Sequence, residues 1–311
     1  ENCGACHWYG GGGDNVKHGD MGSTLANPDR NHDVHMGGLD FSCQECHITT
    51  NHKIAGRSTT SAVSEGVVEC TDCHENRPHD PSSPLLDQLN DHGDAVACQT
   101  CHIPYYAKSD MTRTKWDWSR TGEAERILQE EPDLIKKLSY KKGLIVMEKK
   151  LRPIYVWFNG KHRRYSKGDP ADLNGFTNLN PPVGDINDPS AKITPFKIMK
   201  GVSPADARYG YLVVPKLFGD GYFKDLDWIA ATEKGMKAAG LKFSGQVLFT
   251  ETVMHWRLNH EVVPKKDALS CLDCHGSSGG IMDFKALGYK EDPAGTGGRF
   301  FPVDSGNMKK Q

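Results

Sequence analysis

Cys43-Gln44-Glu45-Cys46-His47 is one of five Cys-x-x-Cys-His pentapeptides in this chain of 311 residues. The other four copies begin at Cys3, Cys70, Cys98 and Cys271. All ten cysteines fall into these five pairs, and a histidine follows every pair although only 14 residues are histidine. The pentapeptide is the attachment motif of a c-type haem, in which the two thiols form thioether bonds to the haem vinyl groups and the adjacent imidazole binds the iron.

The motif predicts five covalently bound haem c groups. The expected attachment residues are Cys3, Cys6, Cys43, Cys46, Cys70, Cys73, Cys98, Cys101, Cys271 and Cys274. The expected proximal iron ligands are His7, His47, His74, His102 and His275. A zinc site or a redox dithiol also uses Cys-x-x-Cys, but neither requires a histidine directly after each pair. No cysteine is left over for a disulfide or an iron–sulfur cluster.

The composition agrees with an interior that is filled by cofactors. Hydrophobic residues make up 37% of the chain, which is low for a globular protein of this length. Five apolar porphyrin plates would supply the core that side chains do not. The net charge of −2 is near neutral and gives no argument for nucleic-acid binding.

The motifs divide the chain into three expected regions. Residues 1–105 hold four motifs, residues 106–250 contain no cysteine, and residues 251–311 hold the fifth motif. Because the first four motifs are closely spaced, their haems should lie near enough to pass electrons directly. We expect a mainly α fold with much irregular structure, packed around a chain of haems.

The haem-free middle region has its own local signals. Residues 122–138 have the apolar spacing of a helix, and residues 225–240 predict a second helix that ends at a glycine. Asn159-Gly160 lies between two β-prone runs and predicts a small β-hairpin over 154–165. Residues 168–205 are rich in Pro, Asn, Asp and Gly and predict an ordered loop or linker.

Nine histidines lie outside the motifs, and five haems with two axial imidazoles each need five of them. Imidazole on both faces leaves the iron without an open site and suits electron transfer. The distal candidates are His18, His35, His52, His79, His92 and His260. A sixth iron-binding histidine would exceed the number of haems, and would serve a haem on another chain or segment.

The other histidines have different expected roles. His32 lies three residues before His35, so one of the two would bind iron while the other supports a ligand. A helix over 251–262 is expected to carry His255 and His260 towards the last haem. His162 lies beside two arginines in the expected hairpin, and we expect it at the surface.

Several longer stretches carry a family resemblance. They are Asn2–Asp20, Asp33–Met36, Cys98–Pro104, Trp116–Trp118, Trp157–Gly160, Leu258–His260 and Ala268–His275. Together they resemble the octahaem tetrathionate reductase family of c-type cytochromes. The resemblance implies a mostly helical arrangement of packed haems, related to that of multihaem nitrite reductases and hydroxylamine oxidoreductases.

The match to that family is not complete. Its members are eight-haem proteins, and this sequence begins two residues before what resembles their fourth haem motif. The three haems that precede this point in the family include the catalytic haem, which has a lysine ligand. The resemblance therefore implies a C-terminal five-haem part without the catalytic module, and it does not carry over the reductase activity.

An electron conduit is the function that the sequence favours. Five haems with two histidine ligands each would form a wire for respiratory or extracellular electron transfer. The first motif lies two residues from the start of the chain, so copies could hand electrons to one another, share ligands and polymerise into a cytochrome filament. The expected partners are redox proteins or extracellular electron acceptors.

An oxyanion reductase is the alternative, acting on tetrathionate, nitrite or hydroxylamine. It would need an open haem face and cations that hold the anion, for which the candidates are Lys17, Arg57 and Arg113. Such cations more commonly pair with haem propionates or face solvent. The sequence therefore favours a carrier over an enzyme.

Two weaker hypotheses also concern the middle region. A docking surface could form from Trp116, Trp118, Trp157 and Trp228, although tryptophans pack equally well in cores. Calcium could bind to the loop acids Asp169, Asp185 and Asp188, although such loops are usually solvated turns.

The haem motif also predicts where the protein resides. Attachment of haem c takes place outside the cytoplasm, so we expect an exported protein that is periplasmic, extracellular or at the cell surface. The sequence has no run of about 20 apolar residues that would predict a transmembrane helix. It opens without a signal peptide, which indicates cleavage or a start within a longer precursor.

Overall fold

The computed structural model describes residues 3–54, 68–123, 140–276 and 280–296. The strands are β1 (Thr49–Thr50), β2 (Lys53–Ile54), β3 (Thr112–Asp117), β4 (Leu144–Glu148), β5 (Ile154–Phe158), β6 (Phe176–Asn178), β7 (Lys192–Asp206) and β8 (Val247–Arg257). The α-helices are α1 (Gly4–His7), α2 (Cys43–Cys46), α3 (Pro84–His92), α4 (Cys98–His102), α7 (Tyr222–Asp225), α8 (Trp228–Ala239), α9 (Cys271–Cys274) and α10 (Pro293–Thr296). Short 3-10 turns occupy Ser23–Ala26, Cys70–Asp72, Trp118–Arg120, Tyr140–Lys142 and Lys265–Asp267.

A six-stranded mixed sheet forms the centre of the fold, with strand order β4-β3-β7-β8-β6. β8 pairs antiparallel with one edge of β7 over eleven residue pairs, from Phe196↔Arg257 to Asp206↔Val247. The other edge of β7 pairs first with β5 and then, in parallel, with β3. β7 is therefore the strand to which most of the sheet is joined.

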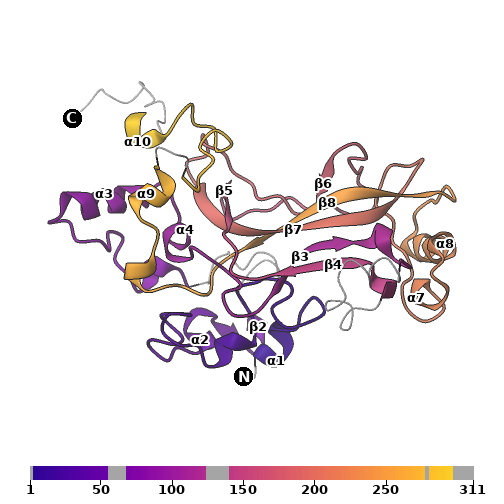
Figure 1. The fold of residues 1–311 in the computed structure, drawn as a ribbon, viewed down its shortest axis with the longest axis horizontal. Coiled ribbons are helices and arrows are strands. Elements are labelled where there is room, and N and C mark those ends of the chain that lie inside the picture. Colours follow the sequence, from indigo (N-terminus) through magenta and orange to yellow (C-terminus); the bar gives the residue numbers. More distant parts are fainter. Residues whose placement is uncertain (1–2, 55–67, 124–139, 277–279, 297–311) are drawn as a thin grey trace.

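The helices fall into two groups around this sheet (Figure 1). α7 and α8 lie at one end, whereas α3, α4, α9 and α10 lie at the other. α1 and α2, drawn in indigo, lie below the sheet near the N-terminus. All four motif helices, α1, α2, α4 and α9, are thus on the side away from α7 and α8.

Two apolar clusters join the motif region to the sheet. In the first, Trp157 of β5 and Ile193 of β7 pack with Met282 and Leu287 from the C-terminal region. The indole N–H of Trp157 donates a 2.8 Å hydrogen bond to the carbonyl of Leu287. In the second cluster Ile103, which directly follows α4, packs with residues that include Leu258. Burial of this apolar surface holds the motif-bearing segments against the rigid sheet.

The predicted helix over 225–240 is confirmed as α8. The Asp227 carboxylate accepts a 3.0 Å hydrogen bond from the backbone N–H of Ala230, which caps the first turn. Gly240 ends the helix with a φ of 70°, the left-handed conformation that glycine adopts without strain. The helix predicted over 122–138 falls largely on residues outside the described ranges.

The predicted hairpin over 154–165 is only partly present. β5 covers 154–158, and Gly160 turns the chain with a φ of 84°. However, β5 pairs with β7 rather than with 161–165, where His162 forms a single bridge with Pro182. The predicted loop over 168–205 is also wrong in part, because β6 and most of β7 lie within it. Residues far along the chain complete these strands, so local signals could not reveal the pairing.

The helix predicted over 251–262 is wrong. Residues 247–257 form β8, in which threonine, valine and aromatic side chains suit a strand between two neighbours. The structure is 23% helix and 21% strand, so a sheet of similar extent accompanies the expected helices.

Among the described residues, no helix has both the length and the apolar character needed to cross a bilayer.

We predict that Gly235→Ala destabilises the protein. Alanine in a helix normally stabilises relative to glycine. In α8, however, a Cβ on Gly235 would lie 1.8 Å from the carbonyl oxygen of Val214, so the backbone would have to move. We expect a loss of about 1–3 kcal/mol in the free energy of unfolding, measured by thermal or denaturant unfolding. Gly295→Ala is the control, because a Cβ there meets nothing within 4 Å. Equal stability of the two variants would contradict the prediction.

Candidate haem-binding sites

Each Cys-x-x-Cys-His motif forms a single helical turn. The turn is closed by the N–H of the histidine, which donates to the carbonyl of the first cysteine at 2.8–3.1 Å in the motifs that end at His7, His47, His74 and His275. Neighbouring side chains cap these turns. Ser270 and Asp273 form a capping box at the fifth motif, and Ser42 accepts from Gln44 at the second. One turn places both thiols and the imidazole next to the same space, as covalent attachment of a haem requires.

None of the ten cysteines forms a disulfide, and most are exposed. The thiols of successive motifs lie close enough to interact. The interacting pairs are Cys3 with Cys43, Cys46 with Cys73, Cys70 with Cys98, and Cys101 with Cys274. The five motifs therefore follow one another in space in the order of the sequence.

A second imidazole faces four of the five motif histidines. The ring centroids are 6.4 Å apart for His7 and His52, 6.1 Å for His47 and His260, 6.1 Å for His74 and His35, and 6.2 Å for His275 and His92. His79 is among the imidazoles that lower the pKa of His102, after the larger effect of burial.

These separations fit an iron between two imidazoles. A metal lies about 2 Å from an imidazole nitrogen, and the nitrogen lies about 1.1 Å from the ring centroid. Two rings on opposite sides of one metal should therefore have centroids about 6.2 Å apart. The four measured separations agree with this value to within a few tenths of an ångström.

A two-residue turn places His52 opposite His7. β1 and β2 pair as a short hairpin around Asn51 and His52. Both turn residues have positive φ, 51° and 61°, as a tight hairpin turn requires. His52 thus lies only five residues after the second motif, although its ring faces His7 of the first.

Helix α3 positions two other histidines. His92, the last residue of α3, faces His275, and its Nδ1 lies 2.8 Å from the carbonyl oxygen of Gln88. Asn90 accepts a 3.0 Å hydrogen bond from the backbone N–H of His79 and donates to the His79 carbonyl at 3.0 Å. A single helix therefore supports partners for the fourth and fifth motifs.

One buried carboxylate connects the segments of His35 and His260. Asp33 Oδ1 accepts hydrogen bonds from the backbone N–H groups of His35 and Met36, each at 2.9 Å. Asp33 Oδ2 accepts from Glu261 at 2.9 Å. Because Asp33 is 3% exposed, these bonds are shielded from competing water.

Four imidazoles of these sites contact the protein through Nδ1. Its contacts are Asp20 Oδ2 for His260 (3.4 Å), Asp292 Oδ1 for His275 (2.6 Å), the Gln88 carbonyl for His92 (2.8 Å) and Asn90 Oδ1 for His79 (3.2 Å). His275 is a motif histidine and shows the same arrangement. Contacts at Nδ1 leave Nε2 available to a metal.

Four of the six distal candidates thus face a motif histidine, and a fifth, His79, lies near enough to His102 to affect its pKa. His18 does not face a motif histidine. The His18 ring packs against Trp256 with centroids 4.9 Å apart. Burial lowers its pKa to about 4, against an opposing effect of Asp20. His260 faces the second motif rather than the last one, because 251–257 is a strand and not part of a helix that leads to the last haem.

The remaining histidines lie within the protein framework. His32 uses both nitrogens, since Nδ1 lies 3.2 Å from Ser109 and Nε2 lies 3.4 Å from Glu261. His255 is buried in β8. The surface role predicted for His162 is wrong, because its ring packs between aromatic side chains and Nδ1 contacts the Asn180 carbonyl at 3.0 Å.

The other predicted binding residues have local partners. The Arg113 guanidinium lies over the Trp116 ring, Lys17 lies over Trp256, and Arg57 is outside the described ranges. Trp116, Trp118 and Trp228 form one aromatic cluster, while Trp157 is in the core.

The candidate calcium ligands cap turns. Asp169, Asp185 and Asp188 accept backbone hydrogen bonds from Ser166, Asn187 and Ser190, respectively. In the described part of the chain no group of three or more His, Cys, Asp and Glu side chains that could hold a metal ion is found.

Comparison with known proteins agrees with this arrangement. The family model for bacterial cytochrome c matches residues 113–278, more than half of the chain. This chain belongs to the bacterial cytochrome c family. A second model, for cytochrome c7 and related cytochromes c, matches residues 29–103 of this bacterial cytochrome c. A search of curated proteins found no match.

A solved structure extends the comparison to most of the chain. The octahaem cytochrome c from Shewanella oneidensis is 42% identical and superposes with a TM-score of 0.84. The match covers 94% of this bacterial cytochrome c and 67% of the Shewanella chain. The protein is therefore a multihaem c-type cytochrome with covalently bound haem, and its fold supports electron transfer.

The sequence motifs identified the thiols and one imidazole of each site, but not the acceptors behind the distal imidazoles. Asp20, Asn90 and Asp292 belong to no motif. Asp20 lies 240 residues from His260, and no pattern in the sequence connects the two.

We predict that His35→Ala opens one haem face. Loss of the imidazole opposite His74 should convert one ferric haem from low spin to high spin, visible by electron paramagnetic resonance. The matched control is His32→Gln, three residues away, which removes a buried imidazole whose two nitrogens contact Ser109 and Glu261. The control should keep every haem low spin. A high-spin haem in His32→Gln and not in His35→Ala would reverse the assignment of these two residues.

Proposed function

We propose that this multihaem cytochrome carries five haems, each ligated by two histidines, and conducts electrons along them. The attachment residues are the ten motif cysteines, and the proximal ligands are the five motif histidines. The distal ligands are His52, His260, His35, His79 and His92, in motif order. The observation that carries the proposal is that each motif histidine has a second imidazole nearby, in four cases at the separation that a shared iron requires.

The order of the motifs supports a linear path. Thiols of the first motif interact with those of the second, and so on to the fifth. A haem attached to each motif would therefore have its sequence neighbours as its spatial neighbours. Each bound haem supplies a one-electron couple, and the protein supplies the spacing and the ligands.

Two histidines on each iron favour a carrier over an enzyme. Substrate reduction at a haem needs an open coordination position, and two imidazoles fill both. Aromatic and backbone contacts also occupy Lys17 and Arg113, the two candidate anion-binding cations within the described ranges. The proposed role is therefore electron transfer to redox partners or to acceptors outside the cytoplasm, in an exported protein.

Polymerisation into a filament is an extension of this proposal. It rests on the first motif lying two residues from the start of the sequence and on a sixth candidate ligand that another copy could use. Since imidazole partners for all five motif histidines come from the same chain, His18 is the distal candidate that remains for a haem elsewhere. Electron microscopy of the purified cytochrome tests the extension directly.

A reductase relay is the second candidate. One observation favours it: the chain spans 67% of an octahaem cytochrome to which it is 42% identical. Together with the resemblance to octahaem tetrathionate reductases, this suggests that these haems feed a catalytic haem located outside the present residues. His18, buried beside Trp256, would then be available to that part of the assembly.

The deciding experiment is electron paramagnetic resonance of the oxidised cytochrome, combined with mass spectrometry of the intact chain. We expect a mass that corresponds to five attached haems and a spectrum that contains only low-spin ferric haem. Addition of nitrite, hydroxylamine or tetrathionate should leave the spectrum unchanged. A stoichiometric high-spin signal that shifts with one of these anions would contradict the carrier and support the reductase.

A further inference from the structure

We propose that Asp20 acts through His260 as a positioning residue that lowers the reduction potential of the haem between His47 and His260. This inference depends on the proposed function, because it assumes that both imidazoles bind one iron. Neither the sequence motifs nor the family matches assign a role to Asp20.

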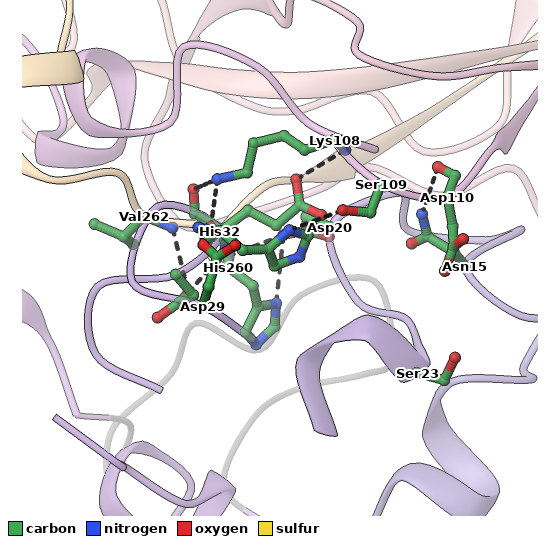
Figure 2. Close-up of polar contacts among 12 residues, drawn as sticks. Asn15, Asp20, Ser23, Asp29, His32, Lys108, Ser109, Asp110, His260 and Val262 are labelled. Atoms are coloured by element: carbon green, nitrogen blue, oxygen red, sulfur yellow. Dashed lines mark hydrogen bonds and ion pairs between the residues drawn. The ribbon is translucent and has the colours of Figure 1, made fainter. Parts of the chain in front are cut away.

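Asp20 is a buried carboxylate aimed at an axial imidazole (Figure 2). Its side chain is 1% exposed. Oδ2 accepts backbone hydrogen bonds from Asn259 at 2.7 Å and from His260 at 3.0 Å, and lies 3.4 Å from His260 Nδ1. Two backbone bonds thus hold the carboxylate in place while the same oxygen faces the ring.

Each side chain of this contact has one buried polar atom without a hydrogen bond. His260 Nδ1 is buried and has no hydrogen bond that meets normal geometry, and Asp20 Oδ1 is buried and unpaired. A modest rotation of the imidazole would convert the 3.4 Å contact into a hydrogen bond. Such a rotation is available to a ring whose Nε2 is directed at an iron.

Backbone donors stabilise the charged form of Asp20. Two backbone N–H groups donate to the same carboxylate oxygen, and hydrogen bonds to a carboxylate favour its ionised form. The Asp20 charge also acts on Lys197, Glu261 and Tyr106, but the Lys197 Nζ donates to the carbonyls of Val16 and Lys17 rather than to the carboxylate. The charge therefore remains directed at the imidazole.

A buried negative charge on Nδ1 should favour ferric iron. A carboxylate that accepts the Nδ1 proton makes the imidazole a stronger donor through Nε2. The oxidised haem carries one more positive charge than the reduced haem, so a nearby anion stabilises it more. The low dielectric around a side chain that is 1% exposed increases this effect.

Three histidines of other sites have different Nδ1 contacts. His79 and His92 contact neutral oxygens, from the Asn90 amide and the Gln88 carbonyl. His275 contacts the carboxylate of Asp292, but that side chain is 40% exposed and water weakens its effect. The haem beside Asp20 should therefore differ in potential from those beside α3.

Asp20→Asn tests the inference, with the potentials of the intact multihaem cytochrome measured by spectroelectrochemistry. Asparagine keeps the shape and one oxygen for the two backbone N–H groups but removes the charge. We expect one of the five couples to rise, with at least a tenfold change in its reduction equilibrium, which corresponds to about 59 mV for a one-electron couple.

Asp33→Asn is the matched control. Asp33 is similarly buried, and its oxygens accept hydrogen bonds from backbone N–H groups, including that of Glu261 next to His260. Asp20 differs because its Oδ2 also lies 3.4 Å from the His260 ring nitrogen. It should shift the potentials less than Asp20→Asn. Equal shifts in the two variants would overturn the inference, since a general loss of buried charge would then explain both.

A second measurement needs no variant. The ring planes of His47 and His260 differ by 37°, against 68–89° for the other three measured pairs. A small angle gives a rhombic low-spin signal, whereas a large angle gives a signal with one large g value. During reductive titration the rhombic signal should persist to lower potential than the large-g signals.

The outcomes separate the two proposals. Disappearance of the rhombic signal before the large-g signals overturns the role of Asp20 and leaves the five-haem wire intact. High-spin haem in the unaltered protein overturns the wire itself. Unchanged couples in a folded, fully low-spin Asp20→Asn variant overturn only the inference about Asp20.

Discussion

This structure depends on one constraint, which is that two imidazole rings lie with their centroids about 6 Å apart. A motif turn by itself presents two thiols and one imidazole, and any flexible surface segment could do the same. The second imidazole must come from elsewhere and be held within a few tenths of an ångström, because metal–ligand distances tolerate little error. A tight turn holds His52, helix α3 holds His92, and buried carboxylates hold the segments of His35 and His260. The irregular N-terminal region therefore has a fixed conformation at the positions of the proposed iron ligands.

The sheet provides the stiffness that these segments lack. β7 and β8 form its longest ladder, and the residues that directly follow β8 run past Asp20 and Asp33. Lys197 of β7 reaches the opposite side of the same loop and binds the carbonyls of Val16 and Lys17. Two strands from the second half of the chain thus fix a loop near its beginning. Buried polar groups make this connection, and each would be costly to leave unpaired, which restricts the loop to one arrangement.

The sequence predicts features that depend on adjacent residues, but it does not predict which distant strands and histidines pair. The haem motif depends on five consecutive residues, and Asp227 and Gly240 mark the ends of α8 by their own conformational preferences. His52 and His79 were found because each lies close to a motif. By contrast, β8 was mistaken for a helix, since its partner β7 begins far earlier in the chain. His18 was chosen for its nearness to the first motif, but the hairpin around His52 supplies that imidazole instead.

The pairing of His47 with His260 has a consequence for how the molecule is made. A ribosome releases the second motif more than two hundred residues before the imidazole that faces it. The first motif finds its partner within a short hairpin almost at once, whereas the second must wait until β8 has been completed. Under the proposed ligation, errors in ligand choice should therefore concentrate at the second site, where other imidazoles of the N-terminal region lie nearer in the chain than His260.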